Sequence, residues 1–310
     1  MNAENKFELK ARRRNIALLV AYDGTNYNGF QRQRPPSVAI QNILEDRLKK
    51  IFGEKIEMKL RRRNIALQVA YDGTNYNGFQ RQNPPSVAIQ NILEDKLEKI
   101  FGDKIEMTAS GRTDAGVHAL GQVVNFFTNG RIEVEKIPLA ARGILPPDIV
   151  VKRAWEVDKN FSALHSAKSK IYVYKIQRGA TVNPFVERFS WHIPYNLDVD
   201  EMNAALSLIV GEHDFSTFKA ASKVQRNPVR KVFSAEIFPE EIFCADILSI
   251  KIHANGFLYH MARNIFAAAV AVGRGRLSVE RFEKIFAARN RNLAPPTAPA
   301  QGLCLQEVFY

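Results

Sequence analysis

Cysteine is scarce in this sequence, and neither of its two cysteines belongs to a pattern typical of a metal site or a redox motif. Cys244 lies in the stretch IFCADI and Cys304 lies in GLCLQ, both among apolar residues. Neither has a second cysteine or a histidine at the spacing of a zinc site or a C-x-x-C motif. We therefore expect two reduced thiols in the core and no disulfide framework.

Long hydrophobic runs are also absent. No stretch of about 18 apolar residues occurs, so the sequence predicts no membrane-spanning helix and no membrane partner. The N-terminal stretch MNAENKFELKARRRN lacks the apolar segment of a signal peptide. We therefore expect a cytoplasmic protein. With 46% apolar residues among 310, the chain can bury one large core or two ordinary ones without disulfides or metals.

Acidic residues are outnumbered by basic ones. The 44 Lys and Arg residues against 32 Asp and Glu residues give a formal net charge of +12, and the pI is near 9.7. A field of this sign attracts polyanions from solution, which makes nucleic acid the first candidate partner. A solvated basic surface with no role in nucleic-acid binding is the alternative that charge alone leaves open.

A near-verbatim tandem repeat lies in the first third of the chain. Residues 12–58, the first copy, align with residues 61–107, the second copy, with five differences. These are Leu19/Gln68, Arg34/Asn83, Arg47/Lys96, Lys49/Glu98 and Glu54/Asp103. Stacked repeat folds need three or more units, so a repeat present twice predicts no solenoid. We expect the second copy to enter the fold, because it runs directly into the segment that follows, although Leu19 would suit a buried strand position better than Gln68.

Each copy has the pattern of a strand, a turn-rich loop and an amphipathic helix. In the second copy, Ile89, Leu93, Leu97 and Phe101 recur at helical spacing. Ser86 is a plausible N-cap of this helix and Gly102 a stop. Further strands are expected near 104–109, 122–127, 149–157, 171–177, 232–238, 247–253 and 303–309, and further helices at 133–145, 199–210, 257–272 and 278–288.

This order of elements predicts an α+β protein. The polar stretch DKNFSALHSAKSK, residues 158–170, suggests a boundary between two α+β domains. We therefore expect an extra N-terminal segment at 1–60, a first domain at 61–157 and a second domain at 158–310.

The stretch SGRTDAGVH, residues 110–118, predicts a tight loop that presents a carboxylate, Asp114. A turn aspartate alone is most often structural. Arg112, two residues away, could pair with Asp114 and hold it ionised as a nucleophile or base, or it could contact a phosphate. One histidine at a strand start is more often hydrogen-bonded structure, so His118 is left out of the catalytic set.

A second run, SAKSKIYVYKIQR, places Tyr172 and Tyr174 on one face of a strand amid lysine and arginine residues. Aromatic rings beside cations suit the stacking of bases next to phosphates. Two half-buried strand tyrosines are the alternative that this run leaves open.

From Arg61 to Tyr310 the sequence resembles the TruA family of tRNA pseudouridine synthases. The resemblance lies in YDGTNYNGFQRQ (71–82), GRTDAGVHALGQVVNF (111–126), FSALHSAKSKIYVY (161–174), GEHDFSTF (211–218), RNPVRKV (226–232), HMARNI (260–265) and APAQGL (298–303). It implies that Asp114 is the catalytic aspartate, that Arg112 lies near the target nucleotide and that Tyr172 stacks on the target base. Arg226, Arg230 and Arg263 match basic positions that the resemblance assigns provisionally to RNA binding or to organising the cleft.

The resemblance also implies the reaction and the architecture. Such enzymes isomerise uridine to pseudouridine at positions 38, 39 and 40 of the tRNA anticodon stem-loop. They have two ferredoxin-like halves with a joined mixed β-sheet and a basic cleft between them, and they are usually homodimers. An isomerisation needs no redox carrier, ATP or metal, so we expect no cofactor. Whether Asp114 attacks the sugar, attacks the uracil or first removes a sugar proton stays open at this point.

The sequence departs from the family pattern in two places. In FSALHSA, Leu164 and His165 stand where the family has arginine and phenylalanine. The fold that the resemblance implies has room for one such strand and helix, whereas the repeat supplies two. A catalytically impaired tRNA-binding relative is therefore the main alternative. A non-catalytic aromatic RNA-binding platform is disfavoured, because its Lys/Arg-Gly-Phe/Tyr-Gly/Ala-Phe signature is absent.

Overall fold

The computed structural model describes residues 16, 18, 20–30, 32–33, 35–53, 62–221 and 227–310. The chain divides into two compact units, Met1–Leu60 and Arg61–Tyr310. We call them the N-terminal unit and the sheet unit. The boundary expected at 157/158 falls inside the sheet unit and stays a prediction.

The sheet unit is built on a ten-stranded sheet with the order β4-β1-β3-β10-β5-β9-β8-β7, in which β2 also pairs with β3 and β6 with β5. The strands are β1 Arg63–Tyr71, β2 Thr108–Ala109, β3 His118–Thr128, β4 Ile149–Val157, β5 Ser169–Arg178, β6 Trp191–Ile193, β7 Gly211–Asp214, β8 Val229–Ile242, β9 Ala245–Ala254 and β10 Leu303–Phe309. The helices are α2 Ile89–Phe101, α3 Ile137–Arg142, α4 Val199–Ser207, α5 Met261–Gly273 and α6 Val279–Ala287, while α1 Ile40–Phe52 lies in the N-terminal unit.

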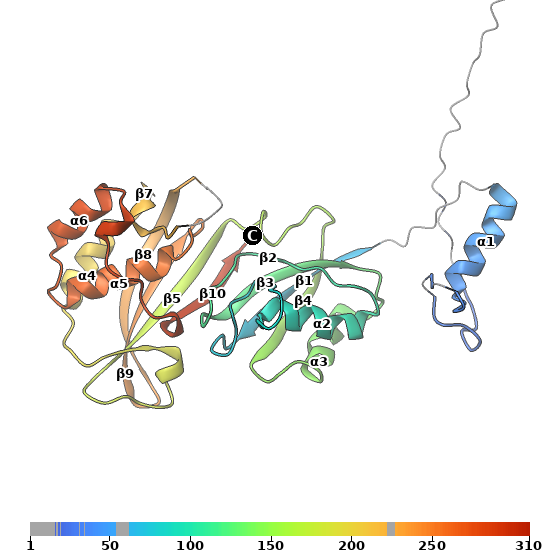
Figure 1. The fold of residues 1–310 in the computed structure, drawn as a ribbon, viewed down its shortest axis with the longest axis horizontal. Helices are drawn as coiled ribbons and strands as arrows, with labels where there is room; N and C mark the ends of the chain where they lie inside the picture. The colour runs from blue at the N-terminus through green and yellow to red at the C-terminus, as the bar shows by residue number, and fades with distance from the viewer. Residues whose placement is uncertain are drawn as a thin grey trace, which may run out of the picture. The chain divides into compact units, whose positions relative to one another are not determined.

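Two halves with the same connectivity make up this sheet. The first has the antiparallel order β4-β1-β3-β2, with α2 following β1 and α3 following β3. The second has the order β10-β5-β9-β8, with α4 following β5 and α5 and α6 following β9. This is the β-α-β-β-α-β arrangement of ferredoxin-like folds. Figure 1 shows α2 and α3 beside the first half and α4, α5 and α6 beside the second.

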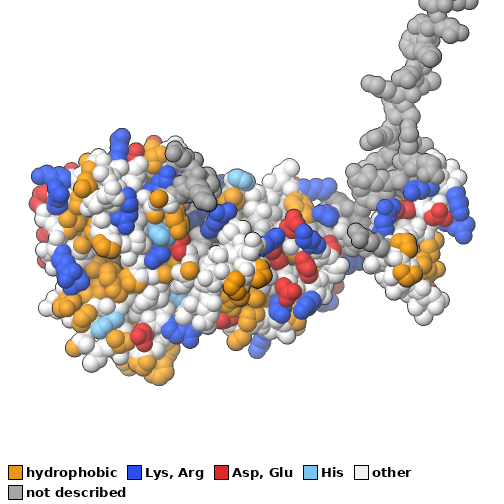
Figure 2. Space-filling view, in the orientation of Figure 1, with side chains coloured by type: hydrophobic (Ala, Val, Ile, Leu, Met, Phe, Trp, Pro, Cys, Tyr) orange, Lys and Arg blue, Asp and Glu red, His pale blue; other side chains and the backbone are white. Residues whose placement is uncertain are grey.

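A short parallel pairing joins the two halves. Residues 304 and 305 of β10 pair with residues 118 and 119 of β3, whereas every other neighbour on the main path is antiparallel. The sheet is therefore mixed and continuous, and the expected α+β fold with a joined mixed sheet is confirmed. Lys and Arg side chains lie over both halves on the face drawn in Figure 2.

The helix of the second copy follows the predicted spacing. Ile89, Leu93 and Leu97 are fully buried along one face of α2. Gly102 ends the helix in the left-handed conformation at φ 70°, which a glycine adopts without a side-chain clash. The N-cap prediction is wrong, because Ala88 is the N-cap residue of the helix and no side-chain oxygen caps it.

Two expected elements are shorter than predicted. The strand expected at 104–109 is reduced to β2, because the N–H groups of Ile105 and Met107 donate to the Glu98 and Glu94 carboxylates of α2. The helix expected at 133–145 is a 3₁₀ turn, Val134–Lys136, followed by the six-residue α3.

The two cysteines differ from each other in burial. Cys304 lies on β10, where burial raises the pKa of its thiol to about 12. Cys244 is exposed, so its assignment to the core is wrong. It follows Phe243 in the turn between β8 and β9, and both residues have positive φ angles.

The second copy supplies the central strand of the first half. β1 pairs with β3 on one side and with β4 on the other. Ile65 and Leu67 on this strand are 0% exposed, whereas their counterparts in the first copy, Ile16 and Leu18, are 53% and 52% exposed. The same apolar residues are therefore core residues in one copy and surface residues in the other.

The first copy nevertheless keeps its local contacts. The Gln41 amide donates to Glu45 at 2.8 Å, as Gln90 donates to Glu94 at 2.9 Å in the second copy. Arg32 forms an ion pair with Glu45, as the corresponding arginine does with Glu94. A loop and a helix that contact each other can form these bonds without a sheet.

Two of the five differences between the copies matter to the sheet unit. Asp103 accepts from the Thr128 hydroxyl and from the Asn129 N–H, each at 2.8 Å, where the first copy has glutamate. Glu98 accepts a backbone N–H, where the first copy has lysine, which has no acceptor. Gln68 is only half-buried, so its position does not require the leucine of the first copy; Leu19 itself lies outside the described residues.

Matched substitutions in the two copies will separate their contributions to stability. Leu67→Ala should lower the free energy of unfolding of the sheet unit by about 2–5 kcal/mol, because it leaves a cavity in a closed core. Leu18→Ala should change it by less than about 0.5 kcal/mol, because that side chain is half exposed. Chemical denaturation of both variants measures the difference, and equal losses would contradict the assignment of the second copy to the core.

Candidate active site

The loop that carries Asp114 is held by the strand and loop of the second copy. The Thr113 hydroxyl shares a buried 2.8 Å hydrogen bond with the Tyr71 hydroxyl. The Thr113 carbonyl accepts from the Phe79 N–H at 3.1 Å. Gly78 has φ +84°, and a Cβ at this position would lie 2.6 Å from the Thr113 carbonyl oxygen. Only glycine allows this close approach of the two loops.

A second set of contacts ties the same loop to β3 and β5. The Gln122 side chain of β3 donates to the Gly111 carbonyl at 2.9 Å and accepts from the Ser110 hydroxyl at 2.7 Å. The Lys170 ammonium group of β5 donates to the Ser110 carbonyl at 2.5 Å. Because β3 and β5 belong to different halves of the sheet, the loop is anchored to both.

Asp114 meets two side chains from the beginning of α5. Its oxygen Oδ2 lies 3.1 Å from Nη1 of Arg263 and 3.4 Å from Nε2 of His260. Arg263 is held in turn, because its Nε donates to the Ala298 carbonyl at 2.8 Å. The Asp114 side chain is 22% exposed. Within the described ranges, its other oxygen, Oδ1, has no hydrogen-bond or ion-pair partner.

The expected pair between Arg112 and Asp114 does not form. The Nε atom of Arg112 donates to the Gln80 side chain at 2.9 Å, in an exposed position. Arg263, and not Arg112, lies beside the Asp114 carboxylate. The structure therefore brings Asp114 and Arg263 together and leaves Arg112 at the outer side of the same loop.

Tyr172 lies on β5 and is 7% exposed. Its ring meets Phe257 edge-to-face, with ring centroids 4.8 Å apart. Burial raises the pKa of the Tyr172 hydroxyl, and the negative charge of Asp114 raises it further, so the phenol is neutral. Tyr174 is fully buried, and its hydroxyl donates to the Pro299 carbonyl at 2.8 Å. Both tyrosines are therefore buried, whereas the alternative interpretation of this run had them half-buried on the strand.

The other arginines named from the sequence lie elsewhere or are not described. Arg230 is at the start of β8, where its Nη1 donates to the carbonyls of Asn227 and Val229 at 2.8 and 2.6 Å. Arg226 lies outside the described residues.

The departure from the family pattern at Leu164 and His165 lies on the turn between β4 and β5, and both side chains are exposed. Beneath this turn the rings of Phe161 and Tyr310 lie 4.9 Å apart. The Tyr310 hydroxyl donates to the Ala163 carbonyl at 2.9 Å. The two departures therefore change the surface of the turn and leave its packing in place.

His118 has a structural environment. Its Nδ1 accepts from the Gly73 N–H at 3.0 Å, and its Nε2 lies 3.1 Å from the Gln301 carbonyl. A ring with one accepting and one donating nitrogen is neutral. Burial also lowers the pKa of His118, which favours the same neutral form. Asp72, which lies 3.1 Å from Nδ1, also forms an ion pair with Arg188.

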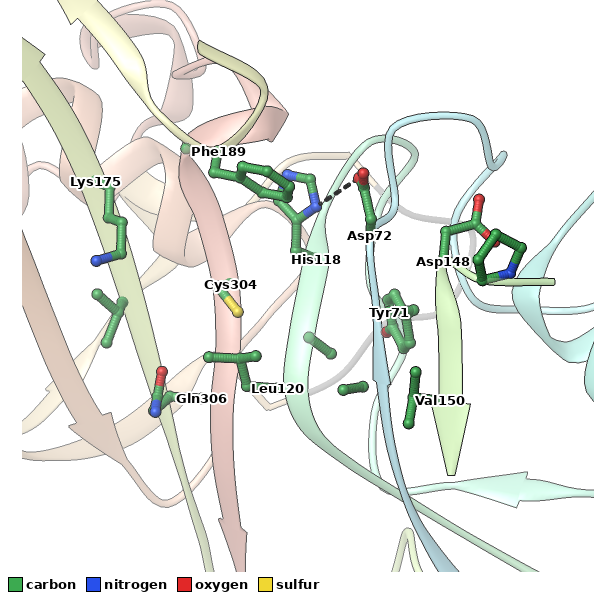
Figure 3. A pocket seen from close by; sticks show the side chains of 15 residues that line it. Tyr71, Asp72, His118, Leu120, Asp148, Val150, Lys175, Phe189, Cys304 and Gln306 are labelled. Carbon is green, nitrogen blue, oxygen red and sulfur yellow. Dashed lines mark ion pairs between the residues drawn. The ribbon is translucent and has the colours of Figure 1, made fainter. Parts of the chain in front are cut away.

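A pocket of about 400 Å³ lies beside His118, and its walls include Leu120, Val150 and Cys304 (Figure 3). Val173 of β5 also lines it. Successive side chains on a strand point to opposite faces, so this pocket and Tyr172 lie on opposite faces of β5. The pocket is therefore separate from the site around Asp114.

The described residues contain no cluster of three or more His, Cys, Asp or Glu side chains that could hold a metal ion. In the same part of the chain, no helix has the length and apolar character needed to span a membrane.

Paired glycine substitutions will test how the loop is held. Gly78→Ala should lower the free energy of unfolding of the sheet unit by about 1–3 kcal/mol or more, because φ is positive and the Cβ meets a carbonyl. Its counterpart Gly29 also has positive φ, but a Cβ there meets nothing within 4 Å. Gly29→Ala should leave the main unfolding transition unchanged. If chemical denaturation shows equal shifts, the contact between the Gly78 and Thr113 loops does not stabilise the fold.

Comparison with known proteins shows the family to which the chain belongs. The sequence profile of the tRNA pseudouridine synthase family matches residues 67–164 and 205–310. A protein named tRNA pseudouridine synthase A from Thermoanaerobacter sp. (strain X514) is 41% identical over 297 residues, covering 96% of this chain and 100% of the relative. A protein of the same name from Moorella thermoacetica (strain ATCC 39073 / JCM 9320) is 45% identical over 202 residues, covering 65% of this chain and 80% of the relative. The chain therefore belongs to the tRNA pseudouridine synthase family, whose enzymes isomerise uridine in tRNA to pseudouridine.

Proposed function

We propose that this enzyme modifies uridines 38, 39 and 40 of the tRNA anticodon stem-loop, with Asp114 as the catalytic carboxylate. The observation that supports Asp114 is its setting: a partly exposed carboxylate, on a loop anchored to both halves of the sheet, with the Arg263 guanidinium 3.1 Å from one oxygen. The choice of the anticodon arm rests on the resemblance of the motifs to the TruA family.

The isomerisation breaks one bond to the ribose and forms another, and Asp114 takes part in this exchange. The bond between C1′ of the ribose and N1 of uracil breaks, and a bond between C1′ and C5 forms. The proton on C5 leaves and N1 gains a proton, so no atoms are added or lost. Asp114 acts on the sugar, on the ring or on a sugar proton, and each of these roles needs an ionised carboxylate. Arg263 supplies an opposite charge 3.1 Å from one oxygen of this carboxylate.

Five other residues have roles in this proposal. The target base leaves its stack and contacts the Tyr172 ring, which Phe257 holds from its edge. Arg112, on the outer side of the Asp114 loop, contacts a phosphate near the target nucleotide. Arg230 contributes to RNA binding, as does Arg226, and Arg263 organises the cleft through Asp114. A homodimer and a cytoplasmic location remain predictions from the sequence.

The alternative is a tRNA-binding relative that the duplication has deprived of turnover. The second copy makes the contacts that hold the Asp114 loop, through Tyr71, Gly78 and Phe79. These observations favour the active enzyme.

Substitution of Asp114 tests the proposed role. Asp114→Ala and Asp114→Asn should lower the rate of pseudouridine formation by about 10³-fold or more, because each removes the proposed reacting carboxylate. The measurement maps pseudouridine position by position in an unmodified tRNA transcript. Asp95→Ala, at an exposed acidic position on α2, is the matched control and should keep the rate. Modification by Asp114→Ala at the normal rate would overturn the role, and modification only outside the anticodon arm would overturn the proposed target.

Removal of residues 1–60 tests whether the first copy is needed. The shortened chain should remain folded and modify the same uridines at a rate within about two-fold of the intact chain, because the second copy forms β1 and α2. Thermal unfolding and the same transcript assay measure both properties. Loss of solubility and of activity together would show that the first copy is required. Activity that appears only after truncation would show that it obstructs the enzyme.

A further inference from the structure

We infer that His260 is a positioning residue for Asp114: together with Arg263 it confines the carboxylate oxygen Oδ2 and leaves Oδ1 to face the substrate. This inference rests on the proposed catalytic role of Asp114. It adds a residue and an assignment of the two carboxylate oxygens to that role.

The first support is that both neighbours address the same oxygen. Nη1 of Arg263 and Nε2 of His260 lie 3.1 and 3.4 Å from Oδ2 of Asp114. Two contacts on one oxygen fix the rotation of a carboxylate, because the torsion about its last bond is otherwise broad. The second oxygen, Oδ1, has no partner in the part of the chain that is described. Oδ1 is therefore the oxygen available for reaction.

The second support is the backbone at the start of α5. His260 is the N-cap residue of this helix and has φ 58° and ψ 1°, the left-handed conformation. Residues other than glycine adopt this conformation infrequently, histidine more often than most of them, and it has an energetic cost. The same turn of chain places Arg263, three residues later, against Asp114. The local conformation thus presents both side chains to one carboxylate.

The third support is the packing and charge around the imidazole. The Tyr259 ring lies against it, with ring centroids 4.0 Å apart. Burial lowers the pKa of His260; the Asp114 charge opposes this shift, and the charges of Arg263 and Arg291 add to it. The ring is therefore neutral at pH 7 and can donate from Nε2 without adding a second positive charge beside Asp114. Protonation of His260 at lower pH would add that charge beside the carboxylate and change the contact that positions it.

The test uses variants that separate the donor from the ring. His260→Phe keeps a ring beside Tyr259 and removes the donor. It should lower kcat by about 10-fold, with KM for tRNA changed by less than about two-fold, because the carboxylate is misplaced while the RNA contacts remain. His260→Asn keeps a side-chain donor and tolerates positive φ, so it should restore kcat to within about three-fold of the intact enzyme. His192→Phe, at a half-exposed position on β6, is the matched control and should have no effect.

The pH profile gives a second measurement. As the pH falls below about 6.5, kcat of the intact enzyme should decline while His260 takes up a proton, and His260→Asn should lack this decline. Thermal unfolding of each variant shows whether it is folded.

The outcomes distinguish this inference from the proposed function. If Asp114→Ala is inactive and His260→Phe has the normal kcat, only the positioning role of His260 is overturned. Equal losses in folded His260→Phe and His260→Asn, or a rise in KM without a change in kcat, would also overturn it. If Asp114→Ala keeps its activity, the proposed catalytic role itself fails, whatever the His260 variants do.

Discussion

The parallel pairing of β10 with β3 is the constraint on which the site depends. It involves residues 304 and 305 on one strand and 118 and 119 on the other, yet it makes one sheet from two halves. The Asp114 loop enters β3 from the first half, and α5, with Arg263, belongs to the second. Because the pairing joins the two halves, the carboxylate of one half and the guanidinium of the other lie 3.1 Å apart. The Lys170 contact to the Ser110 carbonyl crosses the same junction.

The duplicated segment shows that identical residues acquire different structural roles. Both copies form the same helix and the same contacts between loop and helix, because these depend on residues close together in the sequence. Burial of the strand residues needs partners from distant parts of the chain. Leu67 has β3 and β4 as neighbours, whereas Leu18 is half exposed. Local bonds are thus common to both copies, and only one copy gains the hydrophobic stabilisation of a closed core.

The candidate site was predictable in part. The loop sequence GRTDAGVH identified Asp114, because glycines around a carboxylate indicate a tight, rigid presentation, and the resemblance added Tyr172. Of the two roles left open for Arg112, the pairing with Asp114 does not form, because Arg112 is near Asp114 in sequence but bonds to Gln80. His260 was overlooked, although it begins the same HMARNI motif that contains Arg263. Contacts over 149 positions of sequence separation, as between Asp114 and Arg263, have no periodic or local signal.

The sequence by itself determined the local elements of this protein: the period of α2, its end at Gly102, most of the strands and the glycine-rich loop around Asp114. These follow from side-chain spacing and backbone preference, which are properties of neighbouring residues. The tertiary structure alone decided which copy forms β1, which arginine faces Asp114, and that β2 is short because α2 carboxylates take its N–H groups. Each of these depends on which distant groups come within bonding distance, and that is settled only when the two halves pack into one sheet.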